Sequence, residues 1–556
     1  MEFLLTYIQN LLKYQIFFFY LYFFGRGMII VLSKYILGQE KLPSKIFFVN
    51  SRIVYPIIGV VFIGNFLVIL NFFFPLKSTF VIFSMLILLF PNLSVLKFNY
   101  SNILKIENIF YYFLIPSILI FSSFDIFYHY DAGYYHLNNQ NWIRESNIIF
   151  GFVNIFWAFG MSSIYEYISS FLWFDESFIL LHYLNIFFIH FFYIYLFRTI
   201  IYSKEKLLKN ASIFLLIFSL LDNFGVSGGR NGFIYIESIG KQDNSVAILI
   251  YFLSITLFIY IRNKEIKKLD LILLPLVCLF VFQVKLSGVM VSFFYLFFIV
   301  LLIKNNSYQI KNILLYNIPA IIFSLIWVLK TYLQTGCFIF PVSFSCINNF
   351  NWYINGSTES FQEISTVSSY SISKFSTSAE WFKFFAETTY IRNVYINFLI
   401  SFILLIIIKL IFFKKGSFSK EATYFSLIYI FLNVIYLIMF GPIPRYSTGL
   451  LITAVSFLGL KSGDIKINIK KPFYYLLIIF SIILIVRMDS YSFALNNNVP
   501  RYKNFNPRNA TSYLSFNKDW VYPENGDQCW VNLKCTMAKS YINIEKNGIY
   551  KTASKK

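Results

Sequence analysis

Apolar runs of about twenty residues alternate with short polar segments along almost the whole chain. A helix of that length crosses the hydrocarbon core of a bilayer, and a window of the same length finds about fourteen such runs. They begin near Phe17, Val54, Phe80, Ile109, Ser177, Asn210, Val246, Leu269, Ser287, Ile313, Val394, Thr423, Ser447 and Pro472. The pattern predicts an all-α, polytopic membrane protein with about 12–14 transmembrane helices.

The composition excludes a water-soluble protein. Of the 556 residues, 58% are hydrophobic and only 13% are charged, roughly half the charged share of an ordinary globular chain. A net charge of +21 would indicate nucleic acid as the partner of a soluble protein. Here the lysines and arginines lie mostly in short gaps between apolar runs, as they do in cytoplasmic loops. We therefore expect membrane lipid, and no nucleic acid, among the partners.

The basic gaps set the predicted orientation. Three gaps carry four basic residues each against one or two acidic ones, and we expect them on the cytoplasmic side: 198–209, 262–270 and 461–471. Alternation from these gaps puts five other polar segments outside the cytoplasm: a first outer loop at 128–176, short segments at 223–245 and 441–446, a second outer loop at 330–392, and a tail at 488–556. The transmembrane domain is then 1–487.

The densest group of titratable side chains lies in the first outer loop. Asp131 directly follows a predicted span, where a carboxylate is partly desolvated and can accept a proton from a bound hydroxyl. It is the candidate catalytic residue, and capping of the next helix is the plainer alternative. His136 is a candidate ligand. It could hold a divalent metal together with Asp131, although the sequence offers no third ligand.

Two stretches behind this group have an amphipathic pattern. Residues 146–154 and 159–170 combine polar positions with aromatic ones, which is typical of helices that lie along a membrane surface. A groove covered in that way would suit a lipid-linked ligand. An ordinary ordered loop explains the same pattern.

Several motifs resemble one membrane-enzyme superfamily. The run Asp131-Ala-Gly-Tyr-Tyr-His-Leu, with Trp142 and Glu145 behind it, is similar to the first large outer loop of bacterial GT-C-type membrane glycosyltransferases, in particular a branch with the pattern D-x-x-x-Y-H-L. Further pieces that resemble the same branch are Gly151-Phe-Val-Asn, Phe159-Gly-Met-Ser-Ser, Leu329-Lys-Thr, Thr335-Gly-Cys-Phe-Ile-Phe-Pro, Pro442-Ile-Pro-Arg-Tyr, Gly526-Asp-Gln-Cys-Trp and Cys535-Thr. The resemblance implies a GT-C-like fold and a donor sugar carried on a polyprenyl phosphate. It also implies that Asp131 is the base or metal partner of the site.

Such a reaction requires fixed cations for the lipid phosphate that leaves. Arg445, beside Tyr446 in a short outer turn, is the first candidate, Lys285 the second and Arg230 the third. A lysine between two apolar runs, as Lys285 is, needs a phosphate, a carboxylate or a route by which it snorkels to water. Asp243 would help to hold the sugar or a metal, unless it only caps a helix. The candidate substrate and phosphate ligands are therefore Arg445, Lys285, Arg230, Tyr446, His136, Asp243 and Glu145.

Four of the five cysteines form two close pairs in segments predicted to lie outside the cytoplasm. The pairs are Cys337 with Cys346 and Cys529 with Cys535. Disulfides are expected in that compartment, and the sequence leaves their connectivity open.

Three classes of function fit these observations. The preferred one is an enzyme of the bacterial inner membrane that transfers a sugar from a polyprenyl-phosphate carrier to an extracytoplasmic glycan or lipid acceptor, with a divalent metal left open. An O-antigen-type polymerase or ligase would typically carry arginines in its late outer loop, whereas 330–392 holds four basic and four acidic residues. A flippase or transporter of polyprenyl-linked glycans would show charges within spans and an internal repeat, and the sequence shows few of the former and no clear case of the latter.

Overall fold

The computed structural model describes most of the chain. The described residues are 2–39, 42–95, 106–124, 129–173, 183–221, 236–237, 239–263, 266–305, 308–347, 349–354, 357–367, 372–416, 420–440, 443–460, 462–465, 474, 478, 481, 513–517, 520–524, 526–529, 535 and 542–555. Most of residues 472–556, including most of the last predicted span, therefore lies outside them.

Helices dominate the described residues. Eight are long and apolar enough to cross a membrane: α1 (Glu2–Val31) with its π-helical end (Leu32–Ile36), α2 (Ser51–Asn71), the run from α4 (Ile106–Ile109) to α5 (Ile115–Ser123), α8 (Tyr183–Tyr202), α10 (Asp243–Asn263), α12 (Val289–Lys304), α13 (Ile310–Thr335) and α16 (Thr389–Phe412). Between them lie the shorter helices α3 (Thr79–Ile87), α9 (Lys206–Leu221) and α11 (Lys268–Val284), and α17 (Lys420–Phe440) and α18 (Pro444–Leu460) follow α16. The chain is thus a mostly helical, multi-pass membrane protein, as its hydrophobic pattern predicts.

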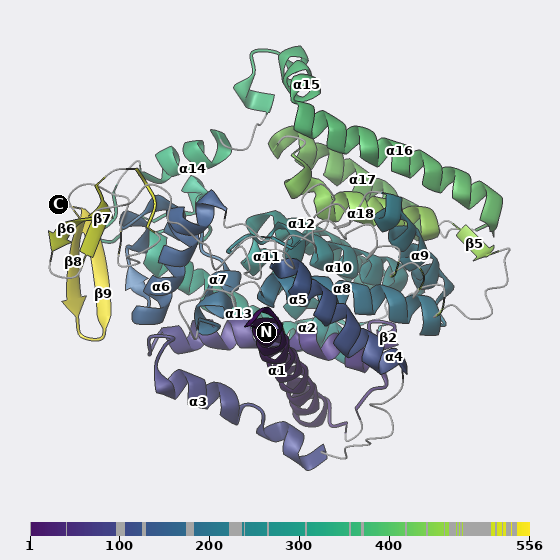
Figure 1. Ribbon diagram of the computed structural model, residues 1–556, viewed down its shortest axis with the longest axis horizontal. Helices are drawn as coiled ribbons and strands as arrows, with labels where there is room; N and C mark the ends of the chain where they lie inside the picture. The colour runs from purple at the N-terminus through teal and green to yellow at the C-terminus, as the bar shows by residue number, and fades with distance from the viewer. Residues whose placement is uncertain are drawn as a thin grey trace.

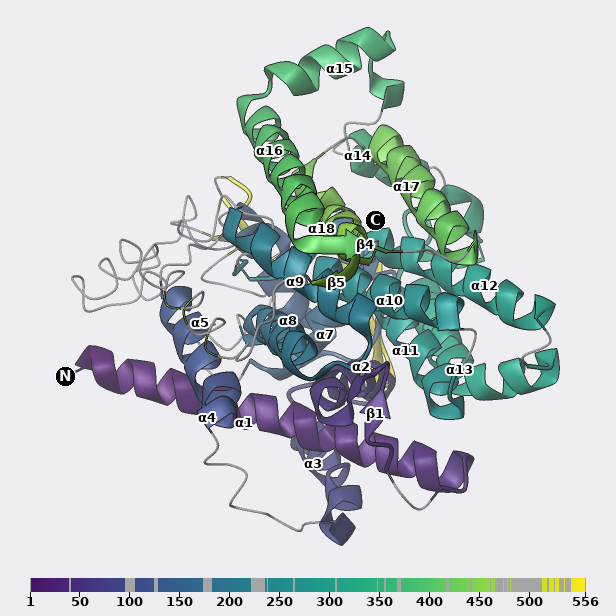
Figure 2. The same cartoon turned by 90° about the vertical axis from the view of Figure 1, so that its right-hand side faces the viewer.

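Helix α10 lies at the centre of this bundle. Figures 1 and 2 show α8, α10 and α11 between α1 on one flank and α16 and α17 on the opposite flank. The described residues of α10 are buried from Asp243 to Ile261, whereas α16 exposes many apolar side chains. An apolar helix that is buried all round belongs to the protein interior, and an exposed apolar face belongs against lipid.

Glycines allow α1 and α2 to cross at backbone contact. A Cβ atom added at Gly25 would come within 1.8 Å of the Tyr55 carbonyl oxygen, and one at Gly59 within 2.1 Å of the Leu21 carbonyl oxygen. Small residues at a crossing point are the usual means by which membrane helices approach closely. This contact fixes the N-terminal helix against the bundle.

The three basic gaps meet at one end of the bundle, which we call the Arg262 end. The Arg262 guanidinium lies 3.3 Å from the Glu205 carboxylate. The Asn210 side-chain amide donates to the carbonyl oxygens of Ser462 and Gly463, at 3.0 Å each. Strand β4 (Phe413–Lys415) pairs with β5 (Ser462–Ile465) at the same end, on the right of Figure 1.

The predicted outer segments meet at the opposite end, which we call the Asp131 end. Strand β3 (Ile149–Phe150) of the first outer loop pairs in parallel with β9 (Tyr550–Lys555), and β9 pairs with β8 (Ile542–Asn547) in an antiparallel hairpin. The Asn154 side-chain amide donates at 3.0 Å both to the Trp352 carbonyl oxygen of the second outer loop and to the Ala553 carbonyl oxygen of β9. Figure 1 shows β8 and β9 on the left, away from β5. Segments predicted to share a side of the membrane therefore share an end of the molecule.

The two amphipathic stretches fold differently from the surface helices expected of them. Residues 146–154 form β3 and a 3-10 turn (Phe152–Asn154), and the second stretch includes α7 (Ile164–Phe171), which is buried from Ile164 to Ser170. Both stretches pack inside the Asp131 end. Strand β9 and the second outer loop cover the first stretch, and α2, α6 (Leu137–Glu145) and α11 contact α7. Periodicity records which positions are apolar but not whether protein or lipid covers them.

Candidate functional site

Asp131 begins a π-helical turn that leads into the first outer loop. The turn (Ala132–His136) continues as α6 (Leu137–Glu145), and the Asp131 side chain makes no capping hydrogen bond to it. Single π-helical turns are often found at functional sites, because the extra residue turns side chains out of the regular helical register. Capping of the next helix, the plainer explanation of Asp131, is therefore not what its carboxylate does.

The Asp131 carboxylate forms an ion pair with Lys241 and lies 3.4 Å from Nδ1 of His129. Partial burial by itself would raise the pKa of Asp131. The hydrogen bonds and charges of His129 and Lys241 outweigh that effect and hold the pKa of the carboxyl well below its usual range. Asp131 is therefore an anion at neutral pH while these two partners remain in place.

A second acid, Glu237, is held in the protein interior beside this pair. Its Oε2 atom accepts hydrogen bonds from the Asn185 side chain and from the Asn244 backbone N–H, at 3.1 Å each. Burial, and next the charge of Asp243, raise the pKa of Glu237 to about 8, although Lys285 and Lys241 act in the opposite direction. This carboxyl can therefore hold a proton near neutral pH.

A second ion pair joins Asp243, the first residue of α10, to Lys285, which directly follows α11. Nζ of Lys285 also lies 4.9 Å from the centroid of the Tyr446 ring, in the first turn of α18. Of the three settings that a lysine between two apolar runs can have, the structure gives Lys285 a carboxylate. It also brings Asp243, Lys285 and Tyr446, three of the predicted site residues, together.

The two ion pairs share one turn of the chain. Lys241 and Asp243 are two residues apart, so their Cα atoms are separated by about 7 Å at most. We call the set Asp131, Glu237, Lys241, Asp243 and Lys285 the charge cluster. It draws on the loop after α5, the turn before α10 and the end of α11, and its two ion pairs neutralise most of its charge.

His136 fixes the position of the turn that carries Lys241. Its Nδ1 lies 2.5 Å from one oxygen of Glu166, and the Gln140 side-chain amide donates to the other oxygen at 2.5 Å. Gly240, directly before Lys241, has φ +77°, and a Cβ atom there would come within 2.0 Å of the His136 ring. The turn that carries Lys241 therefore requires glycine at this position, and the imidazole fixes where that turn lies.

Other predicted site residues lie elsewhere or outside the described residues. Glu145 pairs with Lys77 at the far end of α6, about 20 Å from Asp131 at the helical rise per residue. Arg230 is not among the described residues. Arg445 is in the first turn of α18, next to Tyr446, and its side chain is outside the description. Within the described ranges, no group of three or more His, Cys, Asp or Glu side chains is placed to hold a metal ion.

Two of the sequence motifs meet at a buried lysine that the sequence reasoning passed over. Lys330, from Leu329-Lys-Thr, is fully buried and donates from Nζ to Oγ of Ser162, in Phe159-Gly-Met-Ser-Ser, at 2.6 Å. The same Nζ lies 3.6 Å from the centroid of the Trp327 ring. A lysine inside an apolar run is the signal that could have found it, as it was for Lys285.

The tail motif rests on the loop that carries Asp131. The Cys529 backbone N–H donates to the Gly133 carbonyl oxygen at 2.9 Å, and the Asn138 side-chain amide donates to the Cys535 carbonyl oxygen at 2.6 Å. A disulfide joins Cys529 to Cys535. The tail thus helps to fix the turn between Asp131 and His136.

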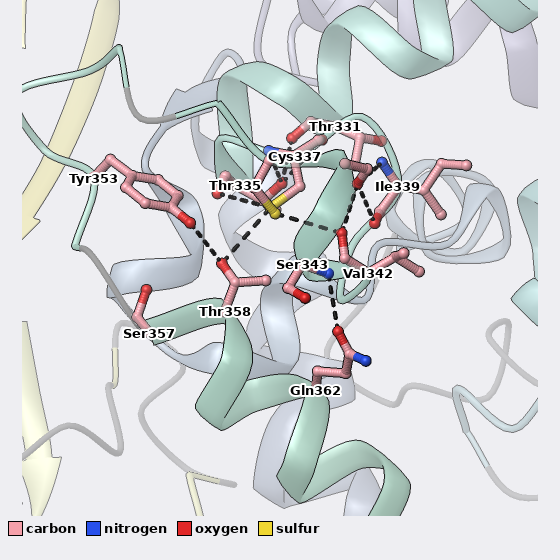
Figure 3. Close-up of a disulfide and its surroundings, with 12 residues drawn as sticks. Thr331, Thr335, Cys337, Ile339, Val342, Ser343, Tyr353, Ser357, Thr358 and Gln362 are labelled. Atoms are coloured by element: carbon pink, nitrogen blue, oxygen red, sulfur yellow. Dashed lines mark hydrogen bonds between the residues drawn. A yellow bond between two sulfur atoms is a disulfide. The ribbon is translucent and has the colours of Figure 1, made fainter.

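The second disulfide, between Cys337 and Cys346, closes the start of the second outer loop. Figure 3 shows it among hydroxyl and amide groups of that loop. Thr358 Oγ1 lies 3.7 Å from Cys337 Sγ and 3.1 Å from the Tyr353 hydroxyl, and the Ser343 N–H donates to Gln362 Oε1 at 2.9 Å. The structure thus joins each of these four cysteines to its near neighbour in sequence.

Sequence reasoning missed the residues that link the cluster. Lys241, Glu166 and Glu237 were not among the candidates. Each has an ordinary sequence context, and only the fold shows that Lys241 faces Asp131 or that Glu166 faces His136.

Comparison with known proteins gives one match. A family model described as a domain of unknown function, DUF8201, matches residues 8–452. No curated protein and no solved structure matches the chain. The matched range includes the whole charge cluster, whereas the tail and its cysteines lie beyond it.

Proposed function

We propose that this chain, which belongs to the DUF8201 family, is an integral-membrane glycosyltransferase with a GT-C-like fold of about 12–14 spans. It moves a sugar from a polyprenyl-phosphate carrier to an extracytoplasmic glycan or lipid acceptor of the cell envelope. In this proposal the protein lies in the bacterial inner membrane. The Arg262 end faces the cytoplasm, because that end carries the basic gaps.

The charge cluster is the observation that carries the proposal. Transfer from a lipid phosphate needs an anion that accepts the proton of the acceptor hydroxyl and cations that bind the phosphate. Both must lie at the membrane surface, where apolar helices meet water. Lys241 and Lys285 supply the positive charges at the ends of α10 and α11, and Asp131 supplies the negative charge from the loop whose motif resembles that of GT-C enzymes. The phosphate of a lipid carrier lies at this depth of the membrane, with its chain among the lipid tails.

The roles follow from the charges. Asp131 accepts a hydrogen bond from the acceptor hydroxyl and takes its proton as the new glycosidic bond forms. The bond between the sugar C1 and the phosphate oxygen breaks, and the phosphate leaves with the electron pair. Lys285 is held beside the Tyr446 ring, next to Arg445 in sequence, and in this proposal both cations stabilise the phosphate.

A second candidate, a flippase for polyprenyl-linked glycans, is favoured by one observation. Glu237 is a buried carboxyl whose pKa lies near 8, and buried carboxyls that take up protons are typical of proton-coupled membrane carriers. A flippase would move the lipid-linked sugar across the membrane without breaking its bond to phosphate.

Replacement of Asp131 by asparagine tests the enzyme directly. The amide keeps the shape of the side chain but cannot take the proton, so we expect Asp131→Asn to lower sugar transfer by about a hundredfold or more. Mass spectrometry of polyprenyl-linked sugars and acceptor glycans would measure this in membranes. Glu205→Gln, which breaks an ion pair at the Arg262 end, is the matched control and should transfer normally. Normal transfer by Asp131→Asn would refute the role of Asp131, and transport of intact donor without bond cleavage would favour the flippase.

A further inference from the structure

We propose that Lys241 changes partners during the reaction: it holds the Asp131 carboxylate before transfer and the leaving lipid phosphate after it. This inference rests on the proposed glycosyltransferase function. It makes Lys241, which no motif indicated, a phosphate ligand, and it couples loss of the proton from the acceptor to departure of the carrier.

The Asp131–Lys241 pair is open enough for a substrate to reach. The exposed fractions of the two side chains are 25% for Asp131 and 14% for Lys241. The neighbouring His136–Glu166 pair is closed, at 5% and 3%. A ligand can therefore reach the first pair directly, whereas the second can act only as support.

The backbone of Lys241 is fixed, whereas its side chain has several rotatable bonds. Gly240 is held against the His136 ring, which Glu166 fixes in turn. The lysine side chain itself is a flexible stem of four methylenes with a compact charge at its end. Its ammonium can therefore exchange one anion for another nearby without movement of the turn.

The charge balance of the reaction provides the driving force. The donor is a phosphodiester with one negative charge, and the released polyprenyl phosphate is a monoester with up to two. At the same step Asp131 takes the proton of the acceptor hydroxyl and becomes neutral. One negative charge thus disappears from Asp131 and one appears on the phosphate. A cation that moves from Asp131 to the phosphate therefore stabilises both the reactant and the product state.

The surroundings of Asp131 single out Lys241 for this exchange. Among the residues that the structure describes, the charged or titratable groups that interact with Asp131 are His129 on its own loop, Lys241 from the turn before α10, and the Tyr134 hydroxyl from the π-helical turn. Lys241 is the lysine in this set. Lys285 is already engaged by Asp243 and the Tyr446 ring. The low pKa that His129 and Lys241 together impose on Asp131 also disfavours early proton uptake, and departure of the lysine makes the carboxylate more basic.

Binding of the product provides a test in which substitutions of Lys241 and of Asp131 should change the affinity in opposite directions. The probe is polyprenyl phosphate in phosphatidylcholine vesicles that contain the full-length protein. Lys241→Gln should bind it about tenfold more weakly, and Lys241→Arg, which keeps the charge, within about threefold of wild type. Asp131→Asn should bind it more tightly than wild type, because it releases the lysine from its competitor. An ion pair with a purely structural role would weaken binding in both single variants, and that result would overturn the proposal.

The pH dependence of transfer gives a second readout. Removal of Lys241 takes away a cation that lowers the pKa of Asp131, so the acid limb of kcat/KM should move to higher pH in Lys241→Gln and stay in place in Lys241→Arg. If Asp131→Asn transfers sugar normally, the proposed function itself fails. If Asp131→Asn is inactive while Lys241→Gln keeps both the wild-type affinity and the wild-type acid limb, only the exchange by Lys241 is refuted.

Discussion

Asp131 and Glu237 belong to one cluster, yet their surroundings move their pKa values in opposite directions. Lys241 and His129 keep Asp131 ionised despite its partial burial, whereas burial and Asp243 keep Glu237 protonated near neutral pH. One cluster thus holds a carboxyl group with a lowered pKa and another with a raised pKa. Such pairs are typical of acid–base chemistry. At this scale the sequence makes Asp131 a candidate but does not predict how its partners shift its pKa.

The raised pKa of Glu237 predicts a dependence of stability on pH. Its folded-state pKa of about 8 lies above the ordinary value of 4.5, so between those pH values the folded state binds a proton that the unfolded state does not. Stability should therefore fall as pH rises through this window, by up to about 1.4 kcal/mol per pH unit. Glu237→Gln, which cannot ionise, should show a flatter curve.

Thermal unfolding in detergent at pH 5, 6, 7 and 8 would measure the effect. Parallel curves for the wild type and Glu237→Gln would show that Glu237 is ionised throughout. Glu380→Gln, on the exposed part of α15 (Ser378–Glu387), is a control in which the wild-type slope should persist.

At the scale of elements, the Asp131 end depends on contacts between segments that are far apart in the chain. Gly151 and Asn154, from one of the sequence motifs, lie where β3, β9 and the second outer loop meet. The motif Gly151-Phe-Val-Asn therefore has a structural role, and it holds no group of the charge cluster. The hydrophobic pattern predicts the helices here. It does not predict the β3–β9 pairing, because the two strands are short and about 400 residues apart.

Substitution of Gly151 tests this junction. Gly151 has φ +68°, and a Cβ atom there would lie 2.4 Å from the Ala553 carbonyl oxygen and 2.9 Å from the Trp352 ring. Gly151→Ala should cost about 2–3 kcal/mol of stability, since it adds a clash to the strain of a left-handed backbone. Gly548→Ala has a similar φ of +65° but open space around it, and should cost about 1 kcal/mol. Equal losses in Tm for the two variants would contradict the packing described here.

At the scale of the whole molecule, the chain returns alternately to two ends, as the charge pattern predicts. The three basic gaps were identified from the sequence alone, and contacts such as Arg262–Glu205 and Asn210–Ser462 bring them together. The fold class and this grouping were predictable because each depends on composition within a segment. The cluster was predictable only in part, because pairs such as Asp131–Lys241 depend on how segments pack.

Labelling from one side of the membrane would test the orientation. Lys546→Cys lies on an exposed position of β8 at the Asp131 end, and Lys204→Cys on an exposed position at the Arg262 end. In intact cells whose outer barrier is opened, a maleimide that cannot cross the inner membrane should label the first variant and spare the second. The opposite pattern would place the charge cluster on the cytoplasmic side and exclude an extracytoplasmic acceptor.

The central claim is that Asp131 lies at a site where sugar leaves a polyprenyl phosphate, and its most direct test follows the donor itself. Purified protein in vesicles would receive extracted polyprenyl-linked sugars and envelope acceptor, with free polyprenyl phosphate measured by mass spectrometry over time. We predict that wild type releases polyprenyl phosphate in step with glycosylated acceptor and that Asp131→Asn releases neither. Release by both proteins at equal rates, or by neither while the native membranes still make the glycan, would contradict it.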